Sequence, residues 1–298
     1  MSGSRCLVVV ADDFGIGPET SRAILELAGD GLITGAVLLV NSPFAAEAVT
    51  AWRAAGRPVE LGWHPSLTLD PPVLPAGAVP SLVGPDGCLW PLRQFLSRLL
   101  AGRLRPAEIA AELAAQYQRF IDLTGAPPAL VNAHQHVAVF PPVGVLLERL
   151  LGRGPSVYVR RVREPWPALA AVPGARFKRA VLNVYGRHQA RRLDQCGFAG
   201  NDWLAGITDP PLVFDPSYLT RWLAALSGQV VELACHPGHH DRTLLGRDCA
   251  TDVWLRRRTE ELRRLREPAF LDAVRAAGFR LTVPSAVRPA PWRASDAA

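Results

Sequence analysis

The chain has 298 residues, of which 49% are hydrophobic, so it can bury a substantial core as one domain without disulfides. Its five cysteines are odd in number and show no C-x-x-C spacing, which excludes a thiolate metal cage and favours a reducing compartment. The formal net charge of +6 leaves an anionic partner open, but no phosphate-binding glycine loop or zinc-finger spacing is present, so we expect no nucleic-acid partner.

The first apolar run, residues 6–10, predicts a buried strand that ends at two adjacent carboxylates, Asp12 and Asp13. No basic region precedes this run, and it is only a few residues long. We therefore expect neither a signal peptide nor a membrane span, and we expect a cytoplasmic location.

Strand-like and helix-like segments alternate along the rest of the chain. This alternation predicts an α/β fold with a parallel sheet, and at this length a barrel rather than an open sheet. We expect one domain over residues 1–285 and a frayed tail over 286–298. The expected strands are 5–11, 36–40, 59–64, 129–134, 157–161, 230–235 and 279–283, and amphipathic helices are expected at 106–123 and 216–226.

Three stretches rich in proline and glycine, 68–91, 165–174 and 197–216, are expected to be long loops over the carboxyl ends of the strands. Residues 256–267 carry arginines and glutamates four apart, which predicts a helix whose charges pair along its own surface. We interpret that helix as a solvated face, with a dedicated anion site as the alternative.

Histidines stand at the predicted ends of several strands. His64 follows one strand, His134 and His136 follow the next, and His236 follows another. In a parallel α/β fold these ends converge on one face, together with Asp12 and Asp13. A single histidine at such a place is more often a hydrogen-bonding residue, but the coincidence of four with an acid pair indicates a site. A carboxylate with two imidazoles is a three-ligand set for a divalent ion, and a second carboxylate and a histidine can serve as base and acid in amide hydrolysis.

Four motifs contain these residues: ADDFG at 11–15, LGWHPSLT at 61–68, VNAHQH at 131–136 and ELACHPG at 232–238. In this order they resemble the four motifs of the YdjC-like carbohydrate deacetylases. The resemblance implies a deformed TIM-like barrel and one divalent ion, Zn²⁺ or Mg²⁺. It also implies that Asp13, His64 and His134 hold the ion, that Asp12 is the general base and that His236 is the general acid.

Other residues are candidates for binding the substrate. Val159-Arg160 followed by Glu164-Pro165 resembles the hopanoid-biosynthesis branch of the family, which suggests Arg160, with a structural salt bridge to a helix as the alternative. His136 is a further candidate, although Ala138 stands where many relatives have a third histidine. Trp203, in a predicted loop, could stack on a sugar ring or could simply anchor the loop.

The sequence therefore predicts a metal-dependent enzyme that hydrolyses the acetamide of an N-acetylated amino sugar, such as N-acetylglucosamine linked to a hopanoid or another glycolipid. That substrate would bring the protein into peripheral contact with the inner membrane. Two alternatives stay open: a deacetylase of soluble chito-oligosaccharides, and a catalytically silent sugar-binding protein on the same scaffold.

Overall fold

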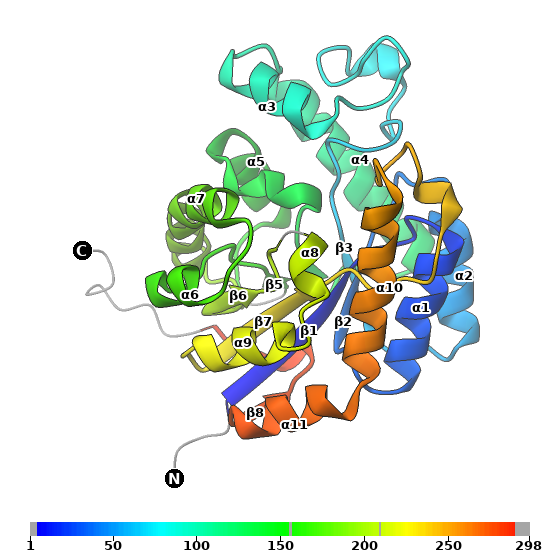
Figure 1. The fold of residues 1–298 in the computed structure, drawn as a ribbon. Helices are drawn as coiled ribbons and strands as arrows, with labels where there is room; N and C mark the ends of the chain where they lie inside the picture. The colour runs from blue at the N-terminus through cyan, green and yellow to red at the C-terminus, as the bar shows by residue number, and fades with distance from the viewer. Residues whose placement is uncertain (1–4, 155–156, 209, 290–298) are drawn as a thin grey trace.

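The computed structural model describes residues 5–154, 157–208 and 210–289 and shows a curled parallel sheet surrounded by helices (Figure 1). All pairings between the described strands are parallel. The strands are β1 (Arg5–Phe14), β2 (Gly35–Leu38), β3 (Glu60–Trp63), β4 (Leu130–Val131), β5 (Tyr158–Val159), β6 (Trp203–Ala205), β7 (Val230–Cys235) and β8 (Phe279–Leu281).

The helices occupy the connections between these strands, as a (β/α) barrel requires. They are α1 (Pro18–Gly29), α2 (Ala45–Ala54), α3 (Leu92–Leu100), α4 (Pro106–Thr124), α5 (Pro141–Leu151), α6 (Trp166–Ala171), α7 (Arg176–Gln195), α8 (Pro210–Val213), α9 (Tyr218–Ala225), α10 (Asp252–Arg266) and α11 (Pro268–Ala276). Short 3₁₀ turns lie at η1 (Ala76–Ala78), η2 (His134–Val139), η3 (Arg242–Leu244) and η4 (Pro284–Ala286). Several helices begin with proline in the first turn, where a missing N–H costs nothing.

The order of the strands confirms the predicted deformed barrel. The sheet runs β5-β4-β3-β2-β1-β7-β6, and β8 pairs with the start of β1. A bridge between Tyr158 in β5 and Ala199, just before β6, joins the two ends of this path. Strand β1 lies at the centre, and its residues from Leu7 to Ala11 are fully buried. The carboxyl ends of the strands therefore share one face of a single α/β domain.

Two of the three predicted loops were wrong in part. Residues 165–174 contain α6, and residues 197–216 contain β6 and α8. Strand β6 has only three residues, which is too short to show alternation in the sequence, and its pairing with β7 makes it a strand. The stretch 68–91 is irregular as expected, apart from η1 and an isolated bridge between Val83 and Leu89.

The chain packs against the core beyond residue 285. Val287 is buried in a cluster with Val8, Val10 and Leu130, so the first residues of the predicted frayed tail belong to the domain. Residues 290–298 of that tail lie outside the described residues. Among the described helices, none is both long and apolar enough to cross a membrane.

Candidate active site

The end of β1 places two adjacent carboxylates in one cavity. Neighbouring residues of a regular strand point to opposite faces, but the register with β2 shifts between Ala11 and Phe14, and Asp13 has a left-handed φ of 63°. Such a bulge turns a side chain toward a different face. Asp12 and Asp13 are each 2% exposed and line the same cavity. The left-handed conformation of a non-glycine residue is a strain often found at functional sites.

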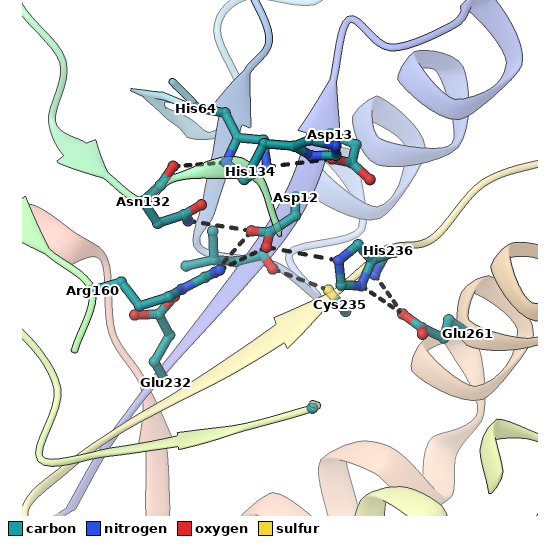
Figure 2. Close-up of polar contacts among 12 residues, drawn as sticks. Asp12, Asp13, His64, Asn132, His134, Arg160, Glu232, Cys235, His236 and Glu261 are labelled. Carbon is teal, nitrogen blue, oxygen red and sulfur yellow. Dashed lines mark hydrogen bonds and ion pairs between the residues drawn. The ribbon is translucent and has the colours of Figure 1, made fainter. Parts of the chain in front are cut away.

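Asp13 meets two buried histidines from neighbouring strand ends (Figure 2). The Oδ1 atom of Asp13 lies 3.3 Å from His64 Nε2 and 3.0 Å from His134 Nδ1. Among the described residues these three side chains are the group whose ligand atoms are close enough to hold one metal ion. His64 Nδ1 lies 2.7 Å from the main-chain carbonyl of Asn132, to which it can donate, leaving Nε2 with its lone pair toward Asp13. A metal-binding histidine typically makes this hydrogen bond, so the residues fit a divalent ion.

Asp12 is held by a buried guanidinium rather than by the histidines. Arg160 Nη1 and Nη2 donate to the two oxygens of Asp12 at 2.6 and 2.8 Å, and Asn132 Nδ2 lies 3.3 Å from Oδ1. Arg160 Nε donates to Glu232 at 2.5 Å, and Tyr158 donates to the same carboxylate at 2.9 Å. Burial alone would raise the pKa of Asp12, but Arg160 outweighs it and holds that pKa well below its usual range. Asp12 is therefore ionised and fixed in orientation.

His236 follows β7 and faces Asp12 across the cavity, with Nε2 3.8 Å from Asp12 Oδ2. Its main-chain N–H donates to Glu261 on α10, and its Nδ1 lies 3.3 Å from Arg257 Nη2. Burial, together with the positive charge of Arg257, lowers the pKa of His236 to about 4. Because the guanidinium can only donate, Nδ1 accepts, and the proton of neutral His236 sits on Nε2 toward Asp12.

These groups line one cavity of about 530 Å³ at the carboxyl ends of the strands. Its lining includes the Asp13, His64 and His134 group together with Asp12 and His236. The lining also includes Leu92 and Arg93 from α3, Lys178 from α7 and Trp254 from α10. The cavity combines a candidate metal centre, an ionised carboxylate and a neutral imidazole with apolar and basic side chains in the rest of its lining.

Comparison with known proteins agrees with this geometry. The family model for YdjC-like protein matches residues 6–276. The chain belongs to the YdjC-like family. A chitooligosaccharide deacetylase of Klebsiella pneumoniae is 29% identical over 93% of this chain and 97% of its own length. A mouse carbohydrate deacetylase is 36% identical over 63% of this chain and 64% of its own length. A solved structure from Enterococcus faecalis V583, of a protein associated with cellobiose-phosphate cleavage, shares the fold with a TM-score of 0.76 at 21% identity, covering 95% of this chain and 98% of its own.

Within this YdjC-like chain, the structure brings together the five residues predicted for the metal and for acid–base chemistry. His136 also lines the cavity; burial, followed by the charge of Arg160, holds its pKa well below the ordinary value, so it is neutral. Ala138, at the position of the third motif histidine, packs in the hydrophobic core instead of lining this cavity.

Two predicted substrate contacts are corrected. Arg160 is 2% exposed and donates to two carboxylates, so it positions Asp12 and is not available to bind substrate. Arg160 does form salt bridges, but its partners Asp12 and Glu232 belong to β1 and β7 rather than to a helix, as the alternative supposed. Trp203 lies in β6 beside Val231, near the amino end of β7, while His236 follows the carboxyl end of that strand. The guanidinium of Arg163 lies over its ring, so Trp203 anchors structure away from the cavity.

Several residues of the site were missed in the sequence. Arg258, on the helix interpreted as a solvated face, is 4% exposed and donates to Asp13 at 2.7 Å. A signal was present, because Leu255, Arg258, Leu262 and Leu265 follow one another at spacings of three and four on the buried face of α10. Glu232 was detectable as a lone acid inside an apolar strand. Asp248, in the loop before α10, carried no pattern that could have identified it.

Proposed function

We propose that this chain is a divalent-metal-dependent deacetylase that hydrolyses the acetamide of an N-acetylated amino sugar. The observation that carries the proposal is the joint presence, in one cavity, of a three-ligand metal group, an ionised carboxylate and a histidine facing that carboxylate. The names of its full-length relatives point the same way. Two imidazoles and one carboxylate suit a transition metal such as Zn²⁺ better than Mg²⁺, which prefers oxygen ligands.

Asp13, His64 and His134 would hold the ion, which when bound polarises the acetamide carbonyl and makes a nearby water more acidic. Asp12 accepts the proton of the attacking water. Its low pKa keeps it ionised and ready for that step, while Arg160 and Asn132 keep it from rotating away. General base catalysis of this kind contributes about 100 to 10,000-fold.

His236 serves the leaving nitrogen. In the imidazolium form of His236, protonated on both nitrogens, Nε2 lies 3.8 Å from Asp12 and donates its proton to the departing nitrogen, while Asp12 keeps the proton taken from the attacking water. Glu261, 3.9 Å from Nδ1, is placed to stabilise the imidazolium when His236 is protonated. The products are acetate and a free amino sugar.

The substrate proposed here is a lipid-linked sugar, N-acetylglucosamine on a hopanoid or another glycolipid. The branch-like motif does not support this substrate, because its Arg160 and Glu164 form internal ion pairs. The support comes from exposed apolar side chains on and beside the cavity lining. Trp254, on the wall, is 40% exposed. Phe177, which precedes the cavity residue Lys178, is 85% exposed, and Leu100 at the end of α3 is 80% exposed. Apolar side chains beside basic ones suit the surface of an anionic bilayer, where each basic residue contributes about 1 kcal/mol.

The first alternative is a deacetylase of soluble chito-oligosaccharides, favoured by the names of the bacterial relatives. The second is a silent sugar-binding protein. Such a binder needs neither a proton acceptor nor a proton donor, so the fixed pair of Asp12 and His236 argues against it.

Acetate release from a substrate panel separates these possibilities. Metal-replete enzyme is given an N-acetylglucosaminyl lipid in anionic vesicles, chito-oligosaccharides and free N-acetylglucosamine. We expect kcat/KM to be highest for the lipid, and Phe177→Ser to lower only that value. Val283→Ser, which removes another exposed apolar side chain outside the cavity wall, is the control. Equal specificity constants for lipid and oligosaccharide would favour the soluble substrate, and absence of acetate from every substrate would favour the binder.

A further inference from the structure

Arg258 bridges the predicted metal ligand Asp13 to a second carboxylate that no motif includes. Its Nη2 atom donates to Asp13 Oδ2 at 2.7 Å and to Asp248 Oδ2 at 2.8 Å. The arginine and Asp13 side chains are nearly inaccessible, and that of Asp248 is 14% exposed. Since Arg258 holds Oδ2 of Asp13, Oδ1 is the oxygen that faces His64 and His134.

A guanidinium in this position has two opposite effects on a metal site. It orients the carboxylate ligand, but it also competes with a cation for that carboxylate and repels the cation. Both unfavourable effects are stronger in a buried site, where charges are weakly screened. Asp248 offsets them, because it supplies a second negative charge to the same nitrogen and leaves the charge of Asp13 available.

The loop before α10 holds Asp248 in place. The preceding residue, Arg247, donates to both oxygens of Asp70 at 2.5 and 2.6 Å and also to the main-chain carbonyl of Ile16. The main-chain N–H of Asp248 donates to the carbonyl of Leu244 at 3.1 Å. These contacts fix the loop that carries the Asp248 carboxylate.

We propose that Asp248 is a positioning residue that sets the divalent-ion affinity of the site by neutralising Arg258. This inference rests on the proposed function only in taking Asp13, His64 and His134 as the metal ligands. It adds a residue outside that ligand set and makes the charge balance between Asp248 and Arg258, rather than either residue alone, the determinant of affinity.

The test measures Zn²⁺ binding by competition with a chromophoric chelator, so it is independent of deacetylation. Asp248→Asn should weaken Zn²⁺ binding by about 10 to 100-fold, the usual effect of removing an outer-shell partner. Removing the positive charge as well, in Asp248→Asn/Arg258→Gln, should recover most of that loss. The control is Asp252→Asn, which also removes a carboxylate paired with an α10 arginine, Arg256, but at the exposed surface. Its Zn²⁺ affinity should equal that of the wild type.

Other outcomes would overturn the proposal. Wild-type affinity in folded Asp248→Asn would show that Asp248 has no role in metal binding. A double variant as weak as the single variant would make Asp248 a ligand in its own right, since its Oδ1 lies 3.9 Å from His134 Nε2. Should Asp248→Asn fail to fold, Asp248→Glu keeps the charge and should bind Zn²⁺ like the wild type, whereas a large loss of affinity there would contradict charge balance. Failure of the wild type to bind Zn²⁺ would instead count against the proposed function.

Discussion

Arg160 and Asp12 form a bidentate ion pair in which each side chain is 2% exposed or less. The arginine comes from the end of β5 and the carboxylate from the end of β1, so the pair spans the interior of the barrel. Glu232 on β7 fixes the third nitrogen of the guanidinium. The proposed base is thus held by strands from both sides of the barrel.

Replacing Arg160 by methionine should leave Asp12 and Glu232 buried without their counter-charge. We expect a loss of stability of about 3–5 kcal/mol, as when one partner of a buried pair is removed. The pKa of Asp12 should rise, because burial is then no longer outweighed, and the acidic limb of the pH–rate profile should move to higher pH. Arg221→Met, which breaks a half-exposed pair with Asp215, should cost no more than about 1 kcal/mol. An acidic limb that does not shift in Arg160→Met would show that ionised Asp12 is not the proton acceptor that limits the rate.

The low pKa of His236 predicts a specific loss of stability in acid. The folded protein holds this pKa at about 4, below the value of about 6.5 for an unfolded histidine, so the unfolded chain binds more protons between those values. The contribution of His236 is therefore fully present above about pH 6.5 and is lost as the pH falls toward 4. Arg257→Met should move the NMR titration of His236 toward 6.5, since it removes the positive charge beside Nδ1. A titration that stays near 4 in this variant would show that burial alone lowers the pKa.

Replacing a proposed metal-binding histidine should have a different effect on metal content and turnover from replacing any other histidine. His64→Ala and His134→Ala should each sharply reduce bound metal and turnover, because either change leaves only two protein ligands. His188→Ala, at an exposed position on α7, should leave both unchanged. Metal analysis of the purified variants provides the measurement, and stoichiometric metal in the double variant His64→Ala/His134→Ala would place the ion elsewhere.

Gly62 allows β3 to approach β4 closely, and this approach helps to place His64 beside Asp13. A Cβ atom at Gly62 would lie 2.3 Å from the main-chain oxygen of Leu130, so the two strands would have to separate. Gly62→Ala should lower the free energy of unfolding by about 1–3 kcal/mol, the usual cost of overpacking, and should also weaken metal binding. Gly77→Ala, where the new Cβ meets nothing within 4 Å, is the matched control in thermal melts. Equal melting temperatures for the two variants would contradict this account.

The sequence predicts well which acids and histidines meet in the cavity, because their meeting depends on topology. Parallel strands bring their carboxyl ends together, so acids and histidines directly after apolar runs must converge, as Asp13, His64 and His134 do. The bulge that places Asp13 in the same cavity as Asp12 was not predictable, because it depends on the pairing of β1 with β2.

The residues that support the site were harder to predict because their roles depend on long-range contacts. Arg258 lies in a segment that resembles an exposed helix, and Arg160 lies among the charges at the end of a strand. Only the packing of the folded chain shows that both arginines are buried. Trp203 illustrates the opposite error. Its segment was too short to be identified as a strand, and a tryptophan in a supposed loop suggested sugar stacking.

The central claim is metal-dependent deacetylation, and the most direct test measures acetate release by enzyme whose metal content is set by the experimenter. Wild-type enzyme is stripped with a chelator, reloaded with Zn²⁺ and given an N-acetylglucosaminyl substrate, while acetate and free amine are both measured. We predict equal amounts of the two products from reloaded wild type, none from stripped enzyme, and a loss of about 100 to 10,000-fold in Asp12→Asn that still holds its metal. Acetate release that survives stripping, or an undiminished rate in metal-loaded Asp12→Asn, would contradict the account.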